Sequence, residues 1–346
     1  MIATKGYAAQ RVNAELAPWN FERRELDAHD VQIEILFCGV CHTDIHFTRD
    51  TWFPGIYPMV PGHEIVGIIK AVGPQAHKFT IGDYAGVGTM VDSCRECADC
   101  KSGHENFCEQ QVVYTYNGVG KDGQVTYGGY ADNIVVHEDF AFRISDQLDL
   151  AATAPLLCAG ITMYSPLRKW KVGNGHKLAI VGLGGLGHMG VKFGLALGAE
   201  VTVISTSASK EASANQLGAH HFIVSKDEAQ MKSVFHSFDF IIDTVSADHD
   251  IHPYIGLLKT NGTYINVGLP AKPWEISSFS VVVGNKAITG SGSGGLQETQ
   301  DMLDFCAEHN IVSDIELIDI KNINEAFERM EKGDVRYRFV IDMATL

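Results

Sequence analysis

The sequence predicts an α/β fold in which a doubly wound parallel sheet is joined to a second, β-rich domain. Two observations carry this prediction. Between about residues 151 and 287, short apolar segments alternate with helical segments, which is typical of parallel strands connected by helices. Before residue 150, short strand-like segments are separated by Gly and Pro turns, which is typical of all-β structure. A length of 346 residues fits two domains.

Composition narrows the class of protein. The net charge of −15 argues against nucleic-acid and anionic membrane partners. The N-terminus lacks the basic start and apolar run of a signal peptide, and no apolar run reaches the roughly 18 residues of a spanning helix. We therefore expect a cytoplasmic protein. Its 8 cysteines should then be thiols or metal ligands rather than disulfides.

The first region holds the predicted β-rich domain. Residues 31–35 alternate apolar and polar side chains, as in a half-buried strand, and 66–73 and 84–88 predict two more strands. Closely spaced turns such as Pro54-Gly55 and Pro61-Gly62 indicate a barrel-like domain with long loops, and loops commonly carry the chemistry of such a domain.

A candidate catalytic metal site begins at Cys41. The segment 41–46 combines a thiol, two imidazoles, a hydroxyl and a carboxylate. His63 and Glu64 follow after one loop, and Cys158 lies far downstream. Two thiolates and one imidazole with one open position are typical of a catalytic zinc site rather than a structural one.

A second metal site is predicted in the same domain. Cys94, Cys97, Cys100 and Cys108 lie close together, as in a closed tetrahedral zinc site that stabilises a lobe. The residues between them are mostly polar and offer little apolar surface to bury. A loop of uncoordinated thiols and an iron–sulfur cluster are the alternatives.

The strongest feature of the second region is a Gly-rich turn. An apolar strand is predicted at 177–181, a helix at 188–197, and Gly182-Leu183-Gly184-Gly185-Leu186-Gly187 lies between them. In this context the pattern predicts dinucleotide binding. Gly182 permits the tight turn, Gly184 lets the pyrophosphate approach the backbone, and Gly187 lets helix and strand pack closely. The helix N-terminus favours the phosphates.

Further strands complete a doubly wound, Rossmann-type sheet. They are predicted at 201–205, 221–224, 238–243, 263–267 and 287–289.

The end of the second strand of this sheet predicts which dinucleotide binds. NAD usually requires Asp or Glu there to hold the ribose hydroxyls, whereas this chain has Ser205, Thr206, Ser207 and, further on, Lys210. Hydroxyl donors and a positive charge suit a 2′-phosphate. We therefore predict NADP(H) over NAD(H). A Ser-rich helix N-cap would give the same pattern, and both can hold.

The last stretch predicts helices at 298–308 and 324–332 and a strand at 337–341. We expect the chain to return here to the first domain. Residues 1–151 and 288–346 would then form one discontinuous domain with both zinc sites, and 152–287 would form the dinucleotide-binding domain.

The motifs together resemble the zinc-dependent medium-chain alcohol dehydrogenases. They are G-V-C-H-T-D-I-H, P-G-H-E, the four-Cys lobe, P-L-L-C-A-G-I-T and G-L-G-G-L-G-H-M-G. Within that family the chain is most similar to the cinnamyl alcohol dehydrogenase-like, NADPH-dependent aldehyde reductases. A zinc site of two cysteines and one histidine is a known property of alcohol dehydrogenase. The zinc ligand set and the family resemblance are therefore one observation and not two. The resemblance implies a GroES-like catalytic domain and two Zn2+ per chain.

The resemblance also implies roles around the catalytic zinc. Cys41, His63 and Cys158 would bind it, and Glu64 would lie beside it as a transient ligand. Asp44 would orient His63, as a metal-bound imidazole requires of some partner.

Four further roles follow from the resemblance. Thr43 would hydrogen-bond the substrate oxygen, and His46 would end a proton relay to solvent. His42 would contact the pyrophosphate, and Thr162 would lie against the nicotinamide.

The implied reaction is hydride transfer between NADPH and a zinc-bound aldehyde of the cinnamyl, benzyl or medium aliphatic type, giving the primary alcohol. Trp52, Phe53, Ile56 and Tyr57 are expected either to line an apolar substrate site or to pack in the core. An NAD-dependent polyol dehydrogenase and a non-catalytic NADPH-binding sensor are the alternatives. A homodimer through the sheet edge near residues 281–289 is expected from the family.

Overall fold

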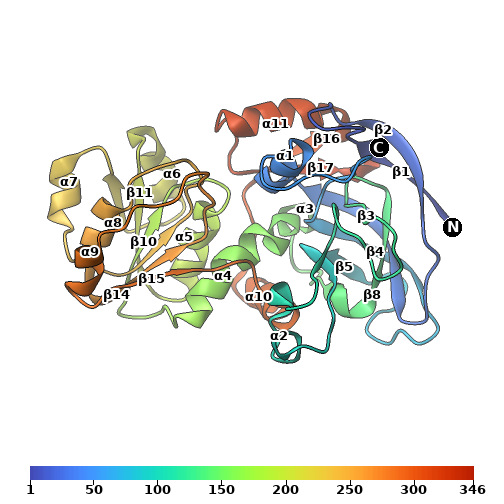
Figure 1. The fold of residues 1–346 in the computed structure, drawn as a ribbon, viewed down its shortest axis with the longest axis horizontal. Coiled ribbons are helices and arrows are strands. Elements are labelled where there is room, and N and C mark those ends of the chain that lie inside the picture. The colour runs from blue at the N-terminus through green and yellow to red at the C-terminus, as the bar shows by residue number, and fades with distance from the viewer. The chain divides into compact units, whose positions relative to one another are not determined.

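The computed structural model describes all residues from 1 to 346, and they fall into two compact units (Figure 1). The first unit contains Met1–Ile161 and Gly294–Leu346, and the second contains Thr162–Ser293. The boundaries predicted from the sequence are 151/152 and 287/288. Helix α4 (Ala159–Lys169) carries the chain from the first unit into the second.

A seven-stranded sheet forms the centre of the first unit. Along the sheet the strands are β16 (Ile315–Asp319), β17 (Arg338–Asp342), β3 (Asp30–Gly39), β4 (Ile65–Val72), β5 (Tyr84–Val87) and β9 (Phe142–Arg143), and β8 (Asn133–His137) also pairs with β3. Only β16 and β17 are parallel. Val340 in β17 lies opposite Gly39 in β3, so the end of the chain pairs with a strand from its first forty residues. The β-rich character predicted for this region is confirmed.

Two small antiparallel sheets complete the strands of this unit. They are β1 (Ile2–Ala8) with β2 (Ala17–Arg23), and β6 (Met90–Asp92) with β7 (Val113–Tyr114). The sequence analysis did not predict the first pair. Pro18 lies within β2, and a proline weakens the strand signal because it cannot donate to a ladder.

The longest helices of the first unit bury one face each. In α11 (Ile323–Glu331) the buried residues are Ile323, Ala326, Phe327 and Met330, spaced three or four apart as an amphipathic helix requires. The other α-helices of this unit, of any length, are α1 (His42–Thr48), α2 (Ala98–Lys101), α3 (Leu150–Thr153) and α10 (Leu296–His309). Its 3-10 turns are η1 (Glu105–Phe107), η2 (Glu138–Phe140), η3 (Ala154–Leu157), η5 (Ile320–Asn322) and η6 (Met343–Thr345).

The second unit is a six-stranded parallel sheet, which confirms the predicted doubly wound fold. The spatial order is β12 (His221–Val224), β11 (Glu200–Ser205), β10 (Lys177–Val181), β13 (Phe238–Asp243), β14 (Leu258–Asn266) and β15 (Ala287–Gly290). This is the strand order of Rossmann folds. Strand β14 begins five residues before its predicted start at 263, and its extra residues include Asn261 and Gly262, which do not favour strands.

Helices alternate with the strands of the second unit (Figure 1). They are α5 (Gly187–Ala196), η4 (Ala208–Lys210), α6 (Glu211–Gln216), α7 (Glu228–Ser233), α8 (His252–Leu257) and α9 (Ser278–Val282). The core between sheet and helices contains fully buried residues such as Ala179, Ile241 and Ile255. The central strands β10 and β11 are buried along most of their length, which explains their mainly apolar sequences.

Membrane-spanning potential is low in each separate helix: none has both the length and the apolar character needed. One bent pair of helical segments, Leu150–Leu157 with Ala159–Lys169, has the required length and apolar character only when the two segments are combined.

Candidate functional site

Three loop ends of the first unit bring Cys41, His63, Glu64 and Cys158 together. Cys41 is the residue before α1, His63 and Glu64 directly precede β4, and Cys158 follows η3. Their potential ligand atoms all lie within 4.8 Å of one another. The Sγ atoms of Cys41 and Cys158 are 4.0 Å apart. The set is well shielded, since Cys41 is 8% exposed and Glu64 is fully buried.

Asp44 holds two of these ligands in place. Its Oδ1 is 3.2 Å from Nδ1 of His63, and its Oδ2 accepts the N–H of Cys41 at 2.9 Å and the hydroxyl of Tyr130 at 2.9 Å. Burial opposes a charge on His63, but Asp44 outweighs it and raises the pKa of His63. With Nδ1 directed at Asp44, Nε2 of His63 is the nitrogen available to a metal, as is usual when a carboxylate orients a ligating imidazole.

Glu64 has one satisfied oxygen and one unsatisfied oxygen. Its Oε1 accepts a hydrogen bond from Nη2 of Arg338, and its Oε2 is buried without a hydrogen-bond partner. Burial raises the pKa of Glu64 to about 7, although the charge of Arg338 opposes the shift. Gly39 makes this arrangement possible, because a Cβ at residue 39 would lie 1.9 Å from Oε2.

These residues fit a zinc ion. Two thiols, one imidazole and one buried carboxylate oxygen without a partner converge on one volume, and thiolate and imidazole are the ligands that zinc prefers. The contact with Cys158 lowers the pKa of Cys41, whereas the pKa of Cys158 rises because one proton is shared between the two sulfurs. Removing the last thiol proton by metal binding would relieve this coupling.

The other residues predicted in segment 41–46 lie at different depths. Thr43 is partly buried, and its Oγ1 is 3.5 Å from Sγ of Cys41. His46 is partly exposed in the last turn of α1, and His42 at its start is exposed. The structure therefore places Thr43 beside the candidate metal ligand Cys41, and the predicted contact of His42 with a pyrophosphate stays a prediction.

Aromatic side chains extend outward from the metal ligands. The ring of Tyr116 stacks on His63 at 5.8 Å, and Phe47 packs edge-on against Tyr116 at 5.6 Å. Trp52 and Phe53 continue this group from Phe47, and Phe53 is 65% exposed. Of the four residues weighed between a substrate site and the core, none is fully buried.

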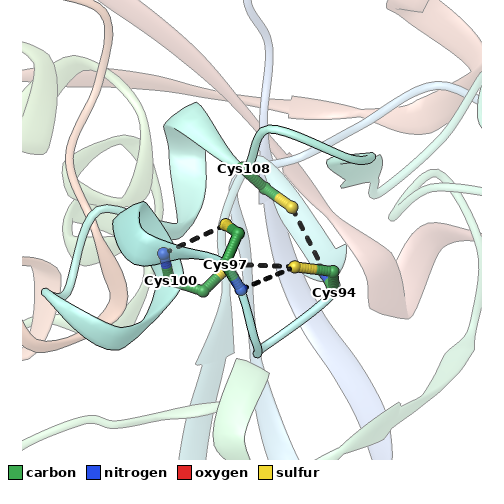
Figure 2. Close-up of side chains that lie close together, drawn as sticks. All are labelled: Cys94, Cys97, Cys100 and Cys108. Atoms are coloured by element: carbon green, nitrogen blue, oxygen red, sulfur yellow. Dashed lines mark hydrogen bonds between the residues drawn. The ribbon is translucent and has the colours of Figure 1, made fainter.

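The four-Cys lobe has the geometry of a second metal site. Figure 2 shows Cys94, Cys97, Cys100 and Cys108 turned toward one another, and their Sγ atoms also lie within 4.8 Å of one another. Backbone N–H groups donate to the sulfurs, at 3.4 Å to Cys108 and 3.5 Å to Cys97. The second of these bonds lowers the pKa of Cys97, which favours the thiolate that a metal requires.

The Gly-rich turn of the second unit has an open face. Gly182 has a φ of +90°, which favours glycine, and a Cβ at Gly187 would lie 2.1 Å from the carbonyl oxygen of Gly182. A Cβ at Gly184 would meet nothing within 4 Å. Leu183, Gly185 and Leu186 complete the turn, and α5 begins at Gly187. An open backbone before a helix N-terminus suits a phosphate group.

Hydroxyl groups and a lysine lie next to this turn at the end of β11. Ser205 ends the strand, and its Oγ accepts the N–H of Ser207 at 3.3 Å. Nζ of Lys210 donates to the carbonyl oxygen of Leu183 at 2.9 Å, which places this cation beside the Gly-rich turn. Thr206 lies between Ser205 and Ser207, and Glu200 is at the opposite end of β11.

Thr162 lies near the start of α4 and is partly buried. Its predicted contact with a nicotinamide stays a prediction.

Sequence reasoning missed three residues of the metal site. They are Arg338, which pairs with Glu64, and Tyr130 and Tyr116, which contact Asp44 and His63. A charged residue at the start of the apolar segment 338–341 was the one available signal for Arg338. The two tyrosines have no such signal, because only the fold brings residues 116 and 130 to residues 44 and 63.

Comparisons with known proteins agree with this description. Residues 27–146 match the protein-family model described as "Alcohol dehydrogenase GroES-like domain", and residues 185–308 match "Zinc-binding dehydrogenase". The chain is 50% identical over 341 residues to a probable cinnamyl alcohol dehydrogenase of Arabidopsis thaliana, covering 98% of this chain and 94% of that protein. It is 51% identical over 341 residues, with the same coverage, to a probable mannitol dehydrogenase of Medicago sativa.

Solved structures give the same result. The crystal structure of CAD from Helicobacter pylori, complexed with NADP(H), superimposes with a TM-score of 0.93 at 42% identity. The match covers 99% of each chain.

Proposed function

This chain belongs to the zinc-dependent medium-chain alcohol dehydrogenases, and on that premise we propose that it uses NADP(H) to interconvert aldehydes and primary alcohols. It is an oxidoreductase by family membership. The dinucleotide and the substrate class are the parts that we propose. The observation that carries it is the hydroxyl and lysine set at the end of β11, next to the Gly-rich turn.

The preference for NADP(H) follows from charge. A 2′-phosphate needs donors and a cation, and Ser205, Ser207 and Lys210 provide them. A carboxylate at the same position would repel the phosphate. Neither of the acidic residues that are closest in sequence, Glu200 and Glu211, occupies that position. Glu200 is engaged with Lys177 and His221 at the start of β11, and Glu211 lies in α6. The relative from Helicobacter pylori, solved with NADP(H), supports this choice.

The metal would be held by Cys41, His63 and Cys158, with Glu64 beside it. A zinc ion bound there supplies a Lewis acid for the substrate oxygen, and the dinucleotide supplies the hydride. The chain's own residues do the rest. Asp44 orients His63, Thr43 offers a hydroxyl to the substrate oxygen, and His46 exchanges a proton with solvent. Arg338 holds one oxygen of Glu64 and leaves the other unpaired.

The four cysteines of the lobe would bind a second, structural zinc. Their loop contains a helix of only four residues, α2, and lacks a large apolar core of its own. Closed zinc sites with four cysteine ligands supply folding energy to such segments.

Aromatic or other large aldehydes are the proposed substrate class. The side chains of Phe47, Trp52, Phe53 and Tyr116 form a continuous aromatic group that reaches His63. Aromatic rings stack on other planar groups, which favours a cinnamyl or benzyl substrate over a polyol. The name of the Arabidopsis thaliana relative points to cinnamyl alcohol, and that of the Medicago sativa relative points to mannitol.

Steady-state kinetics test the proposal. Initial rates of cinnamaldehyde reduction are measured on zinc-loaded protein with NADPH and NADH in parallel, and mannitol oxidation is measured with NADP+ and NAD+. We expect kcat/KM with NADPH to exceed that with NADH by at least ~10-fold, about 1.4 kcal/mol. Preference for NADH with mannitol would favour a polyol dehydrogenase. Absence of turnover with all four combinations of substrate and dinucleotide would favour a non-catalytic NADPH-binding protein.

A further inference from the structure

The imidazole of His46 has two neighbours, which come from the bend that follows α1. The ring of Trp52 stacks on it with centroids 4.1 Å apart and planes 19° from parallel. Oγ1 of Thr51 lies 2.7 Å from Nδ1 of His46. The bend is fixed by a backbone hydrogen bond from the N–H of Thr51 to the carbonyl oxygen of His46, at 3.0 Å.

The proton positions in the contact between His46 and Thr51 follow from a second contact of the Thr51 hydroxyl, with the carbonyl oxygen of His46. Oγ1 of Thr51 also lies 3.1 Å from the carbonyl oxygen of His46, and a carbonyl can only accept. If the Thr51 hydroxyl donates to the carbonyl and accepts from Nδ1–H, both contacts are hydrogen bonds. In the opposite arrangement the hydroxyl donates to Nδ1, and its lone pairs face the carbonyl, so one bond is lost.

The number of hydrogen bonds in each arrangement therefore selects one tautomer of the neutral His46 ring. Nδ1 carries the proton, and Nε2 has the lone pair. No other hydrogen bond is found for the His46 ring within residues 1–346. Nε2 is therefore the one nitrogen that can exchange a proton with a partner outside the chain.

We propose that Thr51 and Trp52 are positioning residues for the proton relay, with Thr51 setting Nε2 of His46 as its basic nitrogen and Trp52 fixing the plane of the ring. This inference rests on the proposed function, because the relay has a task only if the protein interconverts an alcohol and an aldehyde.

The proton balance is simple. In alcohol oxidation, Nε2 accepts the proton that leaves the alcohol oxygen, and His46 becomes an imidazolium that still donates Nδ1–H to Thr51. The imidazolium then releases the Nε2 proton to solvent. In aldehyde reduction the same proton moves in the opposite direction. The other tautomer would present an Nε2–H and could not accept.

The surroundings of His46 favour its neutral form. Burial lowers the pKa of His46, and the neighbouring His42 and Arg49 side chains act in the same direction. Cys41 and Glu331 oppose them, but Glu331 is paired with Arg49. A neutral ring has a tautomer to set, which is the condition for the role of Thr51.

Trp52 acts on the ring plane. Its ring stacks on His46 and also meets the ring of Phe47 edge-on at 6.1 Å. Rotation of the imidazole would break both the stack and the bond to Thr51, so the two contacts support each other.

Nitrogen NMR on the full-length protein tests the tautomer without turnover. The protein is labelled with 15N-histidine, and the His46 signals are identified by their loss in His46→Asn. We expect a protonated Nδ1 and an unprotonated Nε2 at a pH above the pKa of His46. In Thr51→Val the two nitrogens should become averaged between tautomers, and Thr51→Ser should restore the wild-type signals.

Kinetics provide the second readout. Thr51→Val should lower kcat for alcohol oxidation about 5-fold, since one hydrogen bond selects the tautomer, and should leave the KM for the dinucleotide unchanged. Thr51→Ser should recover the rate, and Trp52→Leu should lower kcat without changing the tautomer, because it removes only the stack that fixes the plane of the ring. Thr80→Val is the matched control, an exposed threonine of the same unit, and should behave as wild type.

The results distinguish an error in the tautomer of His46 from an error in the proposed function. A wild-type spectrum with Nε2 protonated, or an unchanged spectrum in Thr51→Val, would overturn the assignment even in an active enzyme. An unchanged rate in a Thr51→Val protein whose tautomers are mixed would overturn its role in the relay. If the wild type shows no turnover with any substrate, the proposed function fails, while the NMR result still decides the tautomer.

Discussion

Arg338 and Glu64 form an ion pair in which the side chains are 5% and 0% exposed. They come from β17 and from the residue before β4, and 274 positions separate them in the sequence. The pair connects the C-terminal segment directly to the candidate metal ligands. A buried pair costs desolvation energy, so its position at the metal site suggests a functional reason for it.

Replacing Arg338 should destabilise the first unit strongly. In Arg338→Met, Glu64 would remain buried without its counter-charge, and losing one partner of a buried pair costs about 3–5 kcal/mol. Urea unfolding measures the change. Arg143→Met, at an exposed arginine of the same unit, is the control. A loss below about 1 kcal/mol would mean that Glu64 is satisfied in some other way.

The two metal sites should be separable by mutation. We predict two zinc ions per chain by elemental analysis, and one in Cys100→Ser, because removing a thiol opens the four-Cys site. The thermal midpoint should fall with the loss. Cys306→Ala replaces a buried cysteine of α10 and should retain both ions. Equal zinc content in all three proteins would contradict the assignment of the lobe.

Lys210 should discriminate between the dinucleotides. In Lys210→Met we expect kcat/KM for NADPH to fall about 10-fold, or about 1.4 kcal/mol, and the value for NADH to stay the same, because only NADPH carries the 2′-phosphate. Lys226→Met replaces an exposed lysine of the same unit and should change neither value. A parallel loss with both dinucleotides would indicate a structural role for Lys210, through its bond to Leu183.

The stability of the second unit should depend on His249. Nε2 of His249 lies 2.7 Å from the buried carboxylate of Asp243, and this bond raises the pKa of His249 although burial opposes it. The folded protein therefore holds the proton more tightly than the unfolded chain. The stabilisation is complete below about pH 6.5 and is lost as the pH rises through the raised pKa.

Thermal unfolding at a series of pH values checks this dependence. The midpoint of the wild type should fall as the pH rises from about 6.5 through the raised pKa of His249, and His249→Gln should remove that part of the decrease. His77→Gln, at an exposed histidine of the first unit, should retain it. Identical curves for all three proteins would sink the assignment.

The association state can be tested at the edge of the parallel sheet. Phe279 and Val282 in α9 are each 75% exposed, and β15 is the edge strand of the six-stranded sheet. We predict a homodimer through this edge, with twice the monomer mass of 37.8 kDa by light scattering. Val282→Asp should give monomers. Val12→Asp is the control, at an exposed valine of the first unit, and should leave the dimer intact. A monomeric wild type would contradict the prediction.

The sequence predicted the second unit almost completely, and the reason is local. Strand β10 is an almost continuous apolar segment, and the Gly-rich turn lies between this strand and a helix that directly follows it in sequence. The metal ligands could also be proposed, because Cys41, His63 and Cys158 are chemically distinctive. What the sequence could not give was their support. Tyr130 on Asp44, Arg338 on Glu64 and Gly39 beneath Glu64 are contacts made by the fold between distant segments.

The β1–β2 pair and the bend after α1 were missed for a related reason. Pro18 weakens the strand pattern of β2. The contacts of Thr51 and Trp52 with His46 depend on one backbone hydrogen bond, and no periodic pattern records such a bend.

The most direct measurement for the central claim is the fate of the hydride. Zinc-loaded protein is incubated with cinnamaldehyde and NADPH that carries deuterium at both positions of C4 of the nicotinamide, and the alcohol is examined by mass spectrometry and NMR. We expect one deuterium on the carbinol carbon of every product molecule, and no product after zinc is removed by a chelator. Alcohol without deuterium, or equal formation in the metal-free protein, would contradict it.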